Sequence, residues 1–386
     1  MTGALRRPGV RYCVSVFLAT RLGFLVLGVV GPGLLPLRSD FPQVPGWPVA
    51  APTPGLHNAI EAWEREDAAW FLRIADSGYA EDDGSAVFFP LYPMAIRAVS
   101  WVIGDLLVAG LLVANLAFLA ALLVMYSLAA SELSEGTARR AVLYASLFPT
   151  SFFFFAPYSE SLFLFLAVSA FWAARRKRWA LAALAAALAA LTRNVGLVLA
   201  PVLALEALHQ RREDPDARLG PGLLASASVG LGTLAYLATW KVRSGDWLAP
   251  LHLQSQWLRT WTPPWRTLAE AIDQAFHQVG VFPGGYWLVD LVVFAAALSI
   301  AVAGLRWLRP SLSAFALVCL AVPLFLPFTG RALLSVPRFV LVIFPLYLVL
   351  AEASERGRIP HAVIVGVGAA GLGLLTPLFL NWYYIF

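Results

Sequence analysis

The sequence has few charged residues and few cysteines, and both shortages narrow the class of protein. Asp, Glu, Lys and Arg make up 13% of the 386 residues, about half of the usual share, while 60% are hydrophobic. This composition excludes an ordinary soluble domain. The two cysteines, Cys13 and Cys319, both fall in apolar stretches, so neither a disulfide framework nor a cysteine zinc site is expected.

Several motifs of soluble enzymes are also missing. The five histidines show no HExxH or other metal-ligand spacing, and no Walker loop or GxSxG elbow occurs. We therefore expect no cofactor and no divalent metal. Asp82, Asp83 and Asp246 could bind a cation, but solvated loop charges are the better interpretation. Because basic residues cluster at the ends of apolar runs, the net charge of +5 does not indicate nucleic acid binding.

Apolar runs of about 20 residues recur along the whole chain and predict an all-α polytopic membrane protein. No Ala-x-Ala cleavage site follows the first run, so it is interpreted as a retained span. Two neighbouring runs, 179–192 and 195–209, are short enough to form one kinked hairpin. About eleven spans are expected: 11–33, 105–132, 138–156, 159–174, 179–192, 195–209, 220–241, 286–305, 311–328, 337–353 and 361–380.

The basic residues predict the orientation of these spans. They occupy alternate connections, and 16 of the 28 share one side of the membrane. By the positive-inside rule this side is predicted to be cytoplasmic, and the amino terminus lies on it. The connections 34–104 and 242–285 then face outside, and residues 381–386 are expected there as an aromatic interfacial tail. Residues 1–386 are expected to form one integral membrane domain, in a bacterial plasma membrane. The basic clusters are Arg6, Arg7, Arg11; Arg139, Arg140; Arg175, Arg176, Lys177, Arg178; Arg211, Arg212, Arg218; Arg306, Arg309; and Arg356, Arg358.

An acidic stretch in the connection 34–104 is the most informative feature, because that connection holds nine of the 23 Asp and Glu residues. If residues 63–79 form a helix, Asp67 shares one face with Trp70 and Phe71, and this face is apolar except for the carboxylate. Asp67 would then point toward lipid or an internal cavity, where its pKa rises and it becomes a better base. The alternative is an amphipathic interfacial helix with solvated charges.

The segment that follows, Phe88-Phe89-Pro90-Leu91-Tyr92-Pro93, has two prolines that bracket aromatic residues. Because proline restricts φ and breaks helices, a rigid turn that enters the membrane is expected. Trp70 and Phe71, together with Phe88, Phe89 and Tyr92, are predicted to shape a lipid groove.

The connection 148–161 joins the third and fourth expected spans on the outer side. Ser159 can cap the next helix, with Glu160 in its first turn near the positive end of the helix dipole. Alternatively, Tyr158 and Glu160 bind a polar acceptor, since ionisable groups at membrane depth are usually functional. The residue types alone leave both interpretations open.

Three arginines, Arg193, Arg331 and Arg338, fall at outer span ends, against the positive-inside trend. Arginine is suited to bidentate phosphate contacts, which would make these residues a donor phosphate site. An interfacial arginine can also simply extend to lipid headgroups. Arg21 lies within the first span and must be paired or lie near a cavity.

These motifs together resemble the PIG-V type (GPI mannosyltransferase II-like) family of the GT-C superfamily. The resemblance implies a GT-C-type fold with interfacial helices in the first outer loop. It also implies transfer of mannose or another hexose from a polyprenyl-phosphate sugar to a lipid-linked or protein acceptor on the extracytoplasmic face. The family's acidic residue corresponds to Asp67. The matching segments follow in the family's order: 67–79, 88–93, 158–163, 192–197 and 337–346.

One departure concerns the base. The family usually has Trp-Asp, whereas here Glu66 precedes Asp67. On an ideal helix the two side chains point about 100° apart, so only one is expected to serve. Asp67 is favoured because it keeps the motif spacing, and Glu66 is the alternative base.

A polyprenyl phosphate is a good leaving group, so one base suffices for an inverting displacement, whereas hydrolysis of a glycoside usually needs a pair of carboxyl groups. Arginine would offset the phosphate charge.

Two other functions remain alternatives. A transporter or flippase of lipid-linked sugars would typically show repeats or broken helices with midplane charges, and the sequence shows no obvious repeat. A polymerase or ligase of surface polysaccharide also places large outer loops beside many spans, but it would use a polymeric donor.

Overall fold

The computed structural model describes residues 7–38, 43–49, 55–81, 83–277 and 286–383. Across these ranges the regular structure is helical, without a β-strand, which confirms the all-α prediction. The elements are α1 (Arg7–Val30), η1 (Gly31–Gly33), α2 (Asn58–Glu61), α3 (Asp67–Ser77), η2 (Ser85–Val87), α4 (Leu91–Ile103), α5 (Leu106–Glu132), α6 (Glu135–Ser146), η3 (Ser151–Phe154), α7 (Glu160–Arg175), α8 (Trp179–Thr192), η4 (Asn194–Val198), α9 (Leu199–Glu213), α10 (Leu219–Ser244), α11 (Ala249–His252), η5 (Leu253–Trp257), α12 (Pro264–His277), α13 (Trp287–Gly304), α14 (Pro310–Ala321), η6 (Val322–Phe325), α15 (Val336–Leu341), α16 (Pro345–Glu355) and α17 (His361–Leu380), where η marks a 3-10 helix.

Five of the described helices, α1, α5, α10, α13 and α17, are long and apolar enough to cross a membrane. The chain is therefore an integral membrane protein, as predicted. The structure does not confirm the expected count of about eleven spans, because several of them are interrupted. Proline explains two interruptions: Pro323 lies at the start of η6, and Pro345 opens α16 after α15 has ended. A proline lacks the N–H group and clashes with the preceding turn, so it separates helices instead of continuing them.

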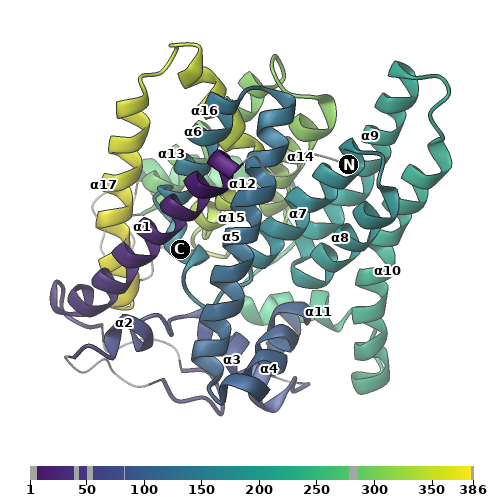
Figure 1. Ribbon diagram of the computed structural model, residues 1–386. Helices are drawn as coiled ribbons and strands as arrows, with labels where there is room; N and C mark the ends of the chain where they lie inside the picture. The colour runs from purple at the N-terminus through teal and green to yellow at the C-terminus, as the bar shows by residue number, and fades with distance from the viewer. Residues whose placement is uncertain (1–6, 39–42, 50–54, 82, 278–285, 384–386) are drawn as a thin grey trace.

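The basic connections gather at one end of the bundle, the upper end in Figure 1. Arg140 pairs there with Glu355 at 3.0 Å, and Arg175 bonds to Glu132 at 2.6 Å and to Glu206 at 2.9 Å. The helices α2, α3, α4 and α11 lie at the opposite, lower end. The separation of the two ends agrees with the charge pattern, and the side of the membrane that each end faces stays a prediction.

The helix expected over residues 63–79 is shorter than predicted. It begins only at Asp67, because Glu66 has φ 51° and ψ −120°, outside the helical region. It ends at Ser77, before Gly78, whose φ of 82° is the left-handed value that glycine tolerates. The expectation that Glu66 and Asp67 lie about 100° apart on one helix was therefore wrong.

Contacts of Arg65 explain why the helix starts late. Its side-chain Nε donates a hydrogen bond to the carbonyl of Leu380 at 3.0 Å, and its own carbonyl accepts one from the Tyr158 hydroxyl at 2.9 Å. Both partners are far away in the sequence. These two contacts hold Arg65 against the rest of the bundle and leave Glu66 as a non-helical link to α3.

The carboxyl-terminal segment is packed where the structure describes it. Asn381 is buried and donates a hydrogen bond to the carbonyl of Gly31 at 2.8 Å, and Trp382 is 1% exposed. The expectation of an interfacial tail over 381–386 was therefore wrong for these two residues, because η1 and the first outer connection pack against them. Residues 384–386 lie outside the described residues.

Arg21 has aromatic rather than acidic neighbours. Its guanidinium carbon lies 4.6 Å from the ring centre of Phe118, 5.0 Å from that of Phe17 and 5.3 Å from that of Phe24. The guanidinium nitrogens are buried and find no hydrogen-bond partner among the described residues. Of the two environments predicted for Arg21, an ion pair is not observed among the described residues, and cation–π attraction takes its place.

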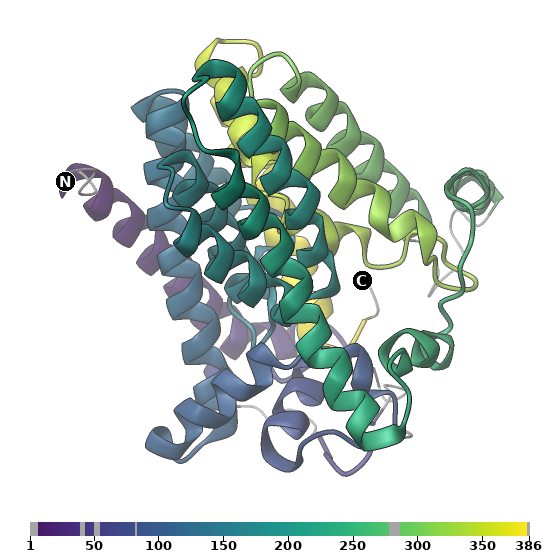
Figure 2. The ribbon, with the colours of Figure 1, turned by 90° about the vertical axis from the view of Figure 1, so that its right-hand side faces the viewer.

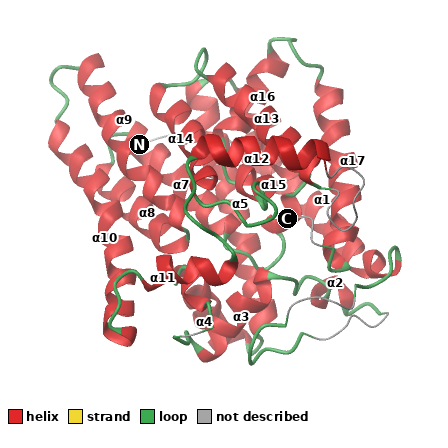
Figure 3. Cartoon of the chain, turned by 180° about the vertical axis from the view of Figure 1, so that it is seen from behind, coloured by secondary structure: helices red, strands yellow, loops and turns green. Residues whose placement is uncertain are grey.

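The amphipathic helix α12 lies across the bundle (Figure 3), and Figure 2 shows it nearly end-on and set apart from the other helices. Trp265, Ile272 and Phe276 on its outer face are exposed. On its inner face, Thr267 donates a hydrogen bond to the carbonyl of Leu324 at 2.7 Å. This hydrogen bond attaches α12 to η6, and residues of η6 form part of the cavity wall described below.

A glycine permits the close approach of α8 and α10, which gives the first prediction. A Cβ at Gly232 would lie 2.4 Å from the backbone oxygen of Ala187, whereas one at Gly230, on the same helix, would meet nothing within 4 Å. We expect Gly232→Ala to destabilise the detergent-solubilised protein by about 1–3 kcal/mol through overpacking. Thermal unfolding followed by fluorescence-detected size exclusion would measure this loss.

Gly230→Ala is the matched control for that prediction. Because alanine favours a helix over glycine, this variant should unfold at the same or a higher temperature than the parent protein. Equal unfolding temperatures for Gly232→Ala and Gly230→Ala would contradict the helix contact described here.

Candidate functional site

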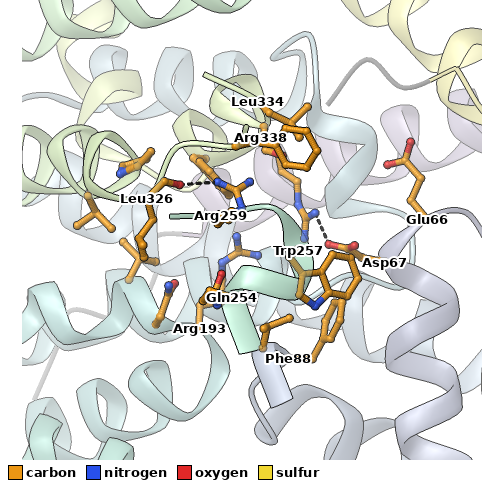
Figure 4. A pocket seen from close by; sticks show the side chains of 18 of the residues that line it. Glu66, Asp67, Phe88, Arg193, Gln254, Trp257, Arg259, Leu326, Leu334 and Arg338 are labelled. Atoms are coloured by element: carbon orange, nitrogen blue, oxygen red, sulfur yellow. Dashed lines mark hydrogen bonds and ion pairs between the residues drawn. The ribbon is translucent and has the colours of Figure 1, made fainter. Parts of the chain in front are cut away.

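A cavity of about 830 Å³ opens beside the first turn of α3. Its charged lining consists of two carboxylates and five arginines, and its remaining walls are largely aromatic and aliphatic (Figure 4). The charged residues are Glu66, Asp67, Arg38, Arg193, Arg259, Arg331 and Arg338. A cavity that combines a charged cluster with apolar walls fits a ligand with a polar head and a lipid chain.

Asp67 is the first residue of α3, and its side chain faces the arginine cluster (Figure 4). Its Oδ2 accepts a hydrogen bond from Nη1 of Arg338. The carboxylate thus lies both at the first turn of α3 and beside a guanidinium group. Phe71 on the same helix is 3% exposed and also lines the cavity. Of the two orientations predicted for Asp67, the internal cavity is the one observed.

Glu160 holds two arginines together from behind the cavity. It is 0% exposed, and its Oε1 accepts hydrogen bonds from Nη1 of Arg193 and Nε of Arg338, both at 2.5 Å. Ser159 does not cap α7, as one interpretation expected, because its hydroxyl accepts a hydrogen bond from Arg193 at 3.1 Å. These two arginines are therefore buried in ion pairs, and neither extends to the lipid headgroup region.

Tyr158 supports the same cluster. Its ring centre lies 4.7 Å from the guanidinium carbon of Arg338, and its hydroxyl donates a hydrogen bond to the carbonyl of Arg65. Neither Tyr158 nor Glu160 lines the cavity. Their predicted contact with an acceptor stays a prediction, and the observed contacts are with arginines.

Arg331 and Arg259 complete the cationic lining. Arg331 forms a bidentate pair with buried Asp290, with Nε–Oδ2 at 2.6 Å and Nη2–Oδ1 at 2.9 Å. Arg259 donates a hydrogen bond to the carbonyl of Leu326 at 2.9 Å, and burial lowers its pKa to about 10. Arg259 was not predicted as a site residue, although it also is a basic residue in an outer connection.

The charges of the cavity do not cancel. Five arginines line it, against two lining carboxylates and two more, Glu160 and Asp290, that pair with arginines from behind. The cavity is thus cationic even when every carboxylate is ionised. A buried guanidinium cluster of this kind is suited to a phosphate or another anion.

Glu66 differs from Asp67 in its surroundings. Its Oε1 is buried and has no hydrogen-bond partner among the described residues, and Figure 4 shows its carboxyl group turned away from the arginine cluster. Burial, and then the negative charge of Asp67, raise the pKa of Glu66 to about 8. At neutral pH Glu66 is therefore mostly protonated.

The aromatic residues predicted to form a lipid groove separate into two sets. Phe71, Phe88 and Phe89 line the cavity. Trp70 stacks on Phe88 with ring centres 5.5 Å apart, and buried Tyr92 donates a hydrogen bond to the carbonyl of Gly110 at 3.0 Å. The last two residues therefore lie behind the wall and do not form its surface.

In the part of the chain that the structure describes, no group of three or more His, Cys, Asp or Glu residues could hold a metal ion. Two of the acidic loop residues considered above have partners, since Asp83 pairs with Arg73 and Asp246 with His252 at 2.7 Å. Asp82 lies outside the described residues.

The family comparison agrees with the resemblance predicted from the motifs. The mannosyltransferase (PIG-V) family model matches residues 49–214, the part of the chain that contributes Asp67, Glu160 and Arg193 to the site. This match confirms the predicted resemblance to the PIG-V type. A sequence comparison with curated proteins finds no significant match.

Two solved structures are similar to this chain, and the one with the TM-score above 0.5 shows the fold. ArnT from Cupriavidus metallidurans, bound to undecaprenyl phosphate, matches with a TM-score of 0.53 and 14% identity, over 94% of this chain and 63% of that chain. The Archaeoglobus fulgidus oligosaccharyltransferase AglB, in complex with an inhibitory peptide and a dolichol-phosphate, has a TM-score of 0.46 and 11% identity, over 97% of this chain and 56% of that chain. This chain thus spans less than two thirds of either protein. The fold is that of the GT-C glycosyltransferases, as predicted.

The buried position of Glu160 gives a prediction about stability. Replacing Glu160 by Gln leaves Arg193 and Arg338 side by side without their shared carboxylate, and breaking a buried ion pair typically costs about 3–5 kcal/mol. We expect Glu160→Gln to lower the unfolding temperature in detergent strongly. Glu355→Gln, which removes a partner 39% exposed, should change stability by less than about 1 kcal/mol. Similar effects of the two substitutions would contradict the bridging role.

The raised pKa of Glu66 predicts a pH dependence of stability. The native protein binds the proton of Glu66 more tightly than the unfolded chain, so this residue lowers the free energy of unfolding as the pH rises from about 4.5 toward 8. Glu66→Gln removes the titrating group. The variant should therefore unfold at a higher temperature than the parent protein at pH 9, with the difference shrinking toward pH 5.

Glu61 provides the control for this pH series, because its side chain is 63% exposed. Glu61→Gln should follow the parent protein at every pH. A constant offset between Glu66→Gln and the parent protein from pH 5 to pH 9 would contradict the raised pKa.

Proposed function

We propose that this protein is a glycosyltransferase that moves mannose, or another hexose, from a polyprenyl-phosphate sugar to a lipid-linked or protein acceptor. The observation that carries the proposal is the cluster of Arg193, Arg259 and Arg338 beside Asp67, in a cavity with aromatic walls. The family match to mannosyltransferases and the fold match to ArnT, whose structure holds undecaprenyl phosphate, support it. The site lies at the end of the bundle away from the basic connections, which supports an extracytoplasmic reaction.

The reaction would be a single inverting displacement. The acceptor oxygen attacks the anomeric carbon of the hexose while the bond from that carbon to the phosphate oxygen breaks. The acceptor proton passes to Asp67, and the products are the new glycoside and the polyprenyl phosphate. The arginines would bind the donor phosphate, with Arg331 beside the other three, and offset the charge that develops as it departs.

The pair between Asp67 and Arg338 has a role in this proposal. In the absence of donor, Arg338 donates a hydrogen bond to the Asp67 carboxylate and occupies one of its oxygens. A donor phosphate would compete for the same guanidinium and weaken its bond to Asp67. The carboxylate oxygen would then be free to accept the acceptor proton only when the donor is bound, which limits proton transfer to the loaded site.

Glu66 is the alternative base, and its protonation argues against it at neutral pH. With a pKa of about 8, the carboxyl group carries its proton at pH 7 and cannot accept another. If Glu66 were the base, transfer should be low at pH 7 and rise as the pH passes 8.

The decisive experiment compares Asp67→Asn with Glu66→Gln. Purified protein would be given polyprenyl-phosphate [¹⁴C]mannose and a membrane lipid extract from the source cell, at pH 7. We expect Asp67→Asn to lower the transfer rate at least about 100-fold, the usual contribution of a general base, and Glu66→Gln to keep most of it. Size-exclusion profiles of both variants control for folding.

Other outcomes of this assay point elsewhere. Loss in Glu66→Gln with retention in Asp67→Asn would assign the base to Glu66. Movement of labelled lipid across vesicles without sugar transfer would favour the transporter alternative. Transfer only from a polymeric donor would favour the polymerase or ligase.

A further inference from the structure

Trp257 lies on the cavity wall, and the mechanism proposed above leaves it without a role. It is the last residue of η5, in the outer connection 242–285, and it is only partly buried. Its ring is steeply inclined to those of Phe88 and Trp70, at 76° and 64°, with centres 5.5 and 5.4 Å apart. Two aromatic neighbours thus support the indole from behind, and the ring surface they leave uncovered borders the cavity.

The first outer connection contacts the indole of Trp257 through Gly84. The indole Nε1 donates a hydrogen bond to the carbonyl of Gly84 at 3.1 Å. Gly84 has a φ of 80°, and a Cβ at this position would come within 2.9 Å of that nitrogen. A side chain at residue 84 would therefore push the ring away. The orientation of Trp257 is set by these contacts with the first outer connection.

Two amide side chains line the same cavity as this ring. In a 3-10 helix, residues three apart lie on the same face, so Gln254 and Trp257 project together. Figure 4 shows both on the cavity wall that also carries Asp67 and Arg193. Gln254 and Asn194 both line the cavity, and neither side chain has a hydrogen-bond partner among the described residues. Their donors and acceptors are therefore available to a ligand.

We propose that Trp257, Gln254 and Asn194 form the subsite for the transferred hexose, an inference that rests on the proposed function. A hexose has one face of C–H groups and a rim of hydroxyls. The C–H face suits the uncovered indole surface, and the hydroxyls suit amides that can both donate and accept hydrogen bonds. Asn194 directly follows Arg193, so a phosphate held by Arg193 would place the attached sugar ring beside these residues.

The subsite predicts a specific difference in binding. The probes are undecaprenyl-phosphate mannose and undecaprenyl phosphate without sugar, and the affinity of purified protein for each is measured by native mass spectrometry. We expect the parent protein to prefer the sugar-bearing lipid. Trp257→Ala should reduce this preference by about 10-fold while binding of the sugar-free lipid stays unchanged. Gln254→Ala should act in the same direction.

Matched variants separate the sugar contact from a merely structural role. Trp257→Phe keeps an aromatic ring and should keep much of the preference. Trp261→Ala removes a tryptophan of the same connection that is 71% exposed, and it should change neither affinity. Arg259→Ala should weaken both lipids together, because it acts on the phosphate. Equal weakening of both lipids by Trp257→Ala, or no effect on either, would overturn the subsite.

The same measurements distinguish failure of the subsite from failure of the transferase proposal. A parent protein that prefers the sugar-bearing lipid, loses this preference in Trp257→Ala and transfers no sugar would support the subsite and contradict the transferase. A parent protein that transfers mannose, with unchanged kcat/KM and binding in Trp257→Ala, would support the transferase and overturn the subsite.

Discussion

The site depends on the buried carboxylate of Glu160. Arg193 and Arg338 lie far apart in the sequence, and two guanidinium groups would repel each other inside a membrane protein without a shared counter-charge. One oxygen of Glu160 accepts a hydrogen bond from each of them, and Arg338 then extends to Asp67. These alternating charges link the first residues of α7 and α3 to α15. The cavity lies beside these three linked elements.

The same alternation makes the site responsive to an anion. The arginines outnumber the carboxylates around the cavity, so a phosphate improves the charge balance instead of disturbing it. Arg338 is shared between Glu160 and Asp67, and a bound phosphate would enter into competition with Asp67 alone, since Glu160 lies behind the wall. Protonated Glu66 adds no charge to this exchange near neutral pH.

The sequence motifs identified part of the site but not its arrangement. Asp67, Arg193 and Arg338 were predicted because each stands out in a local pattern, as a carboxylate on an apolar face or as a basic residue on the wrong side. Trp257 was missed, since the connection 242–285 has many exposed aromatic residues and no local pattern separates this one from Trp261. Its place on the cavity wall depends on Gly84 and Phe88, which belong to another connection.

Hydropathy, periodicity and charge are local properties of the chain, so they were enough to predict the all-α membrane fold, the approximate helices and the gathering of the basic connections at one end. The start of α3 at Asp67, the pairing of Glu160 with arginines and the cavity wall of proline-interrupted segments could not be predicted in this way. Each of these depends on groups distant in sequence, such as Leu380 and Tyr158 around Arg65. Burial and pairing arise from packing, which no local pattern encodes.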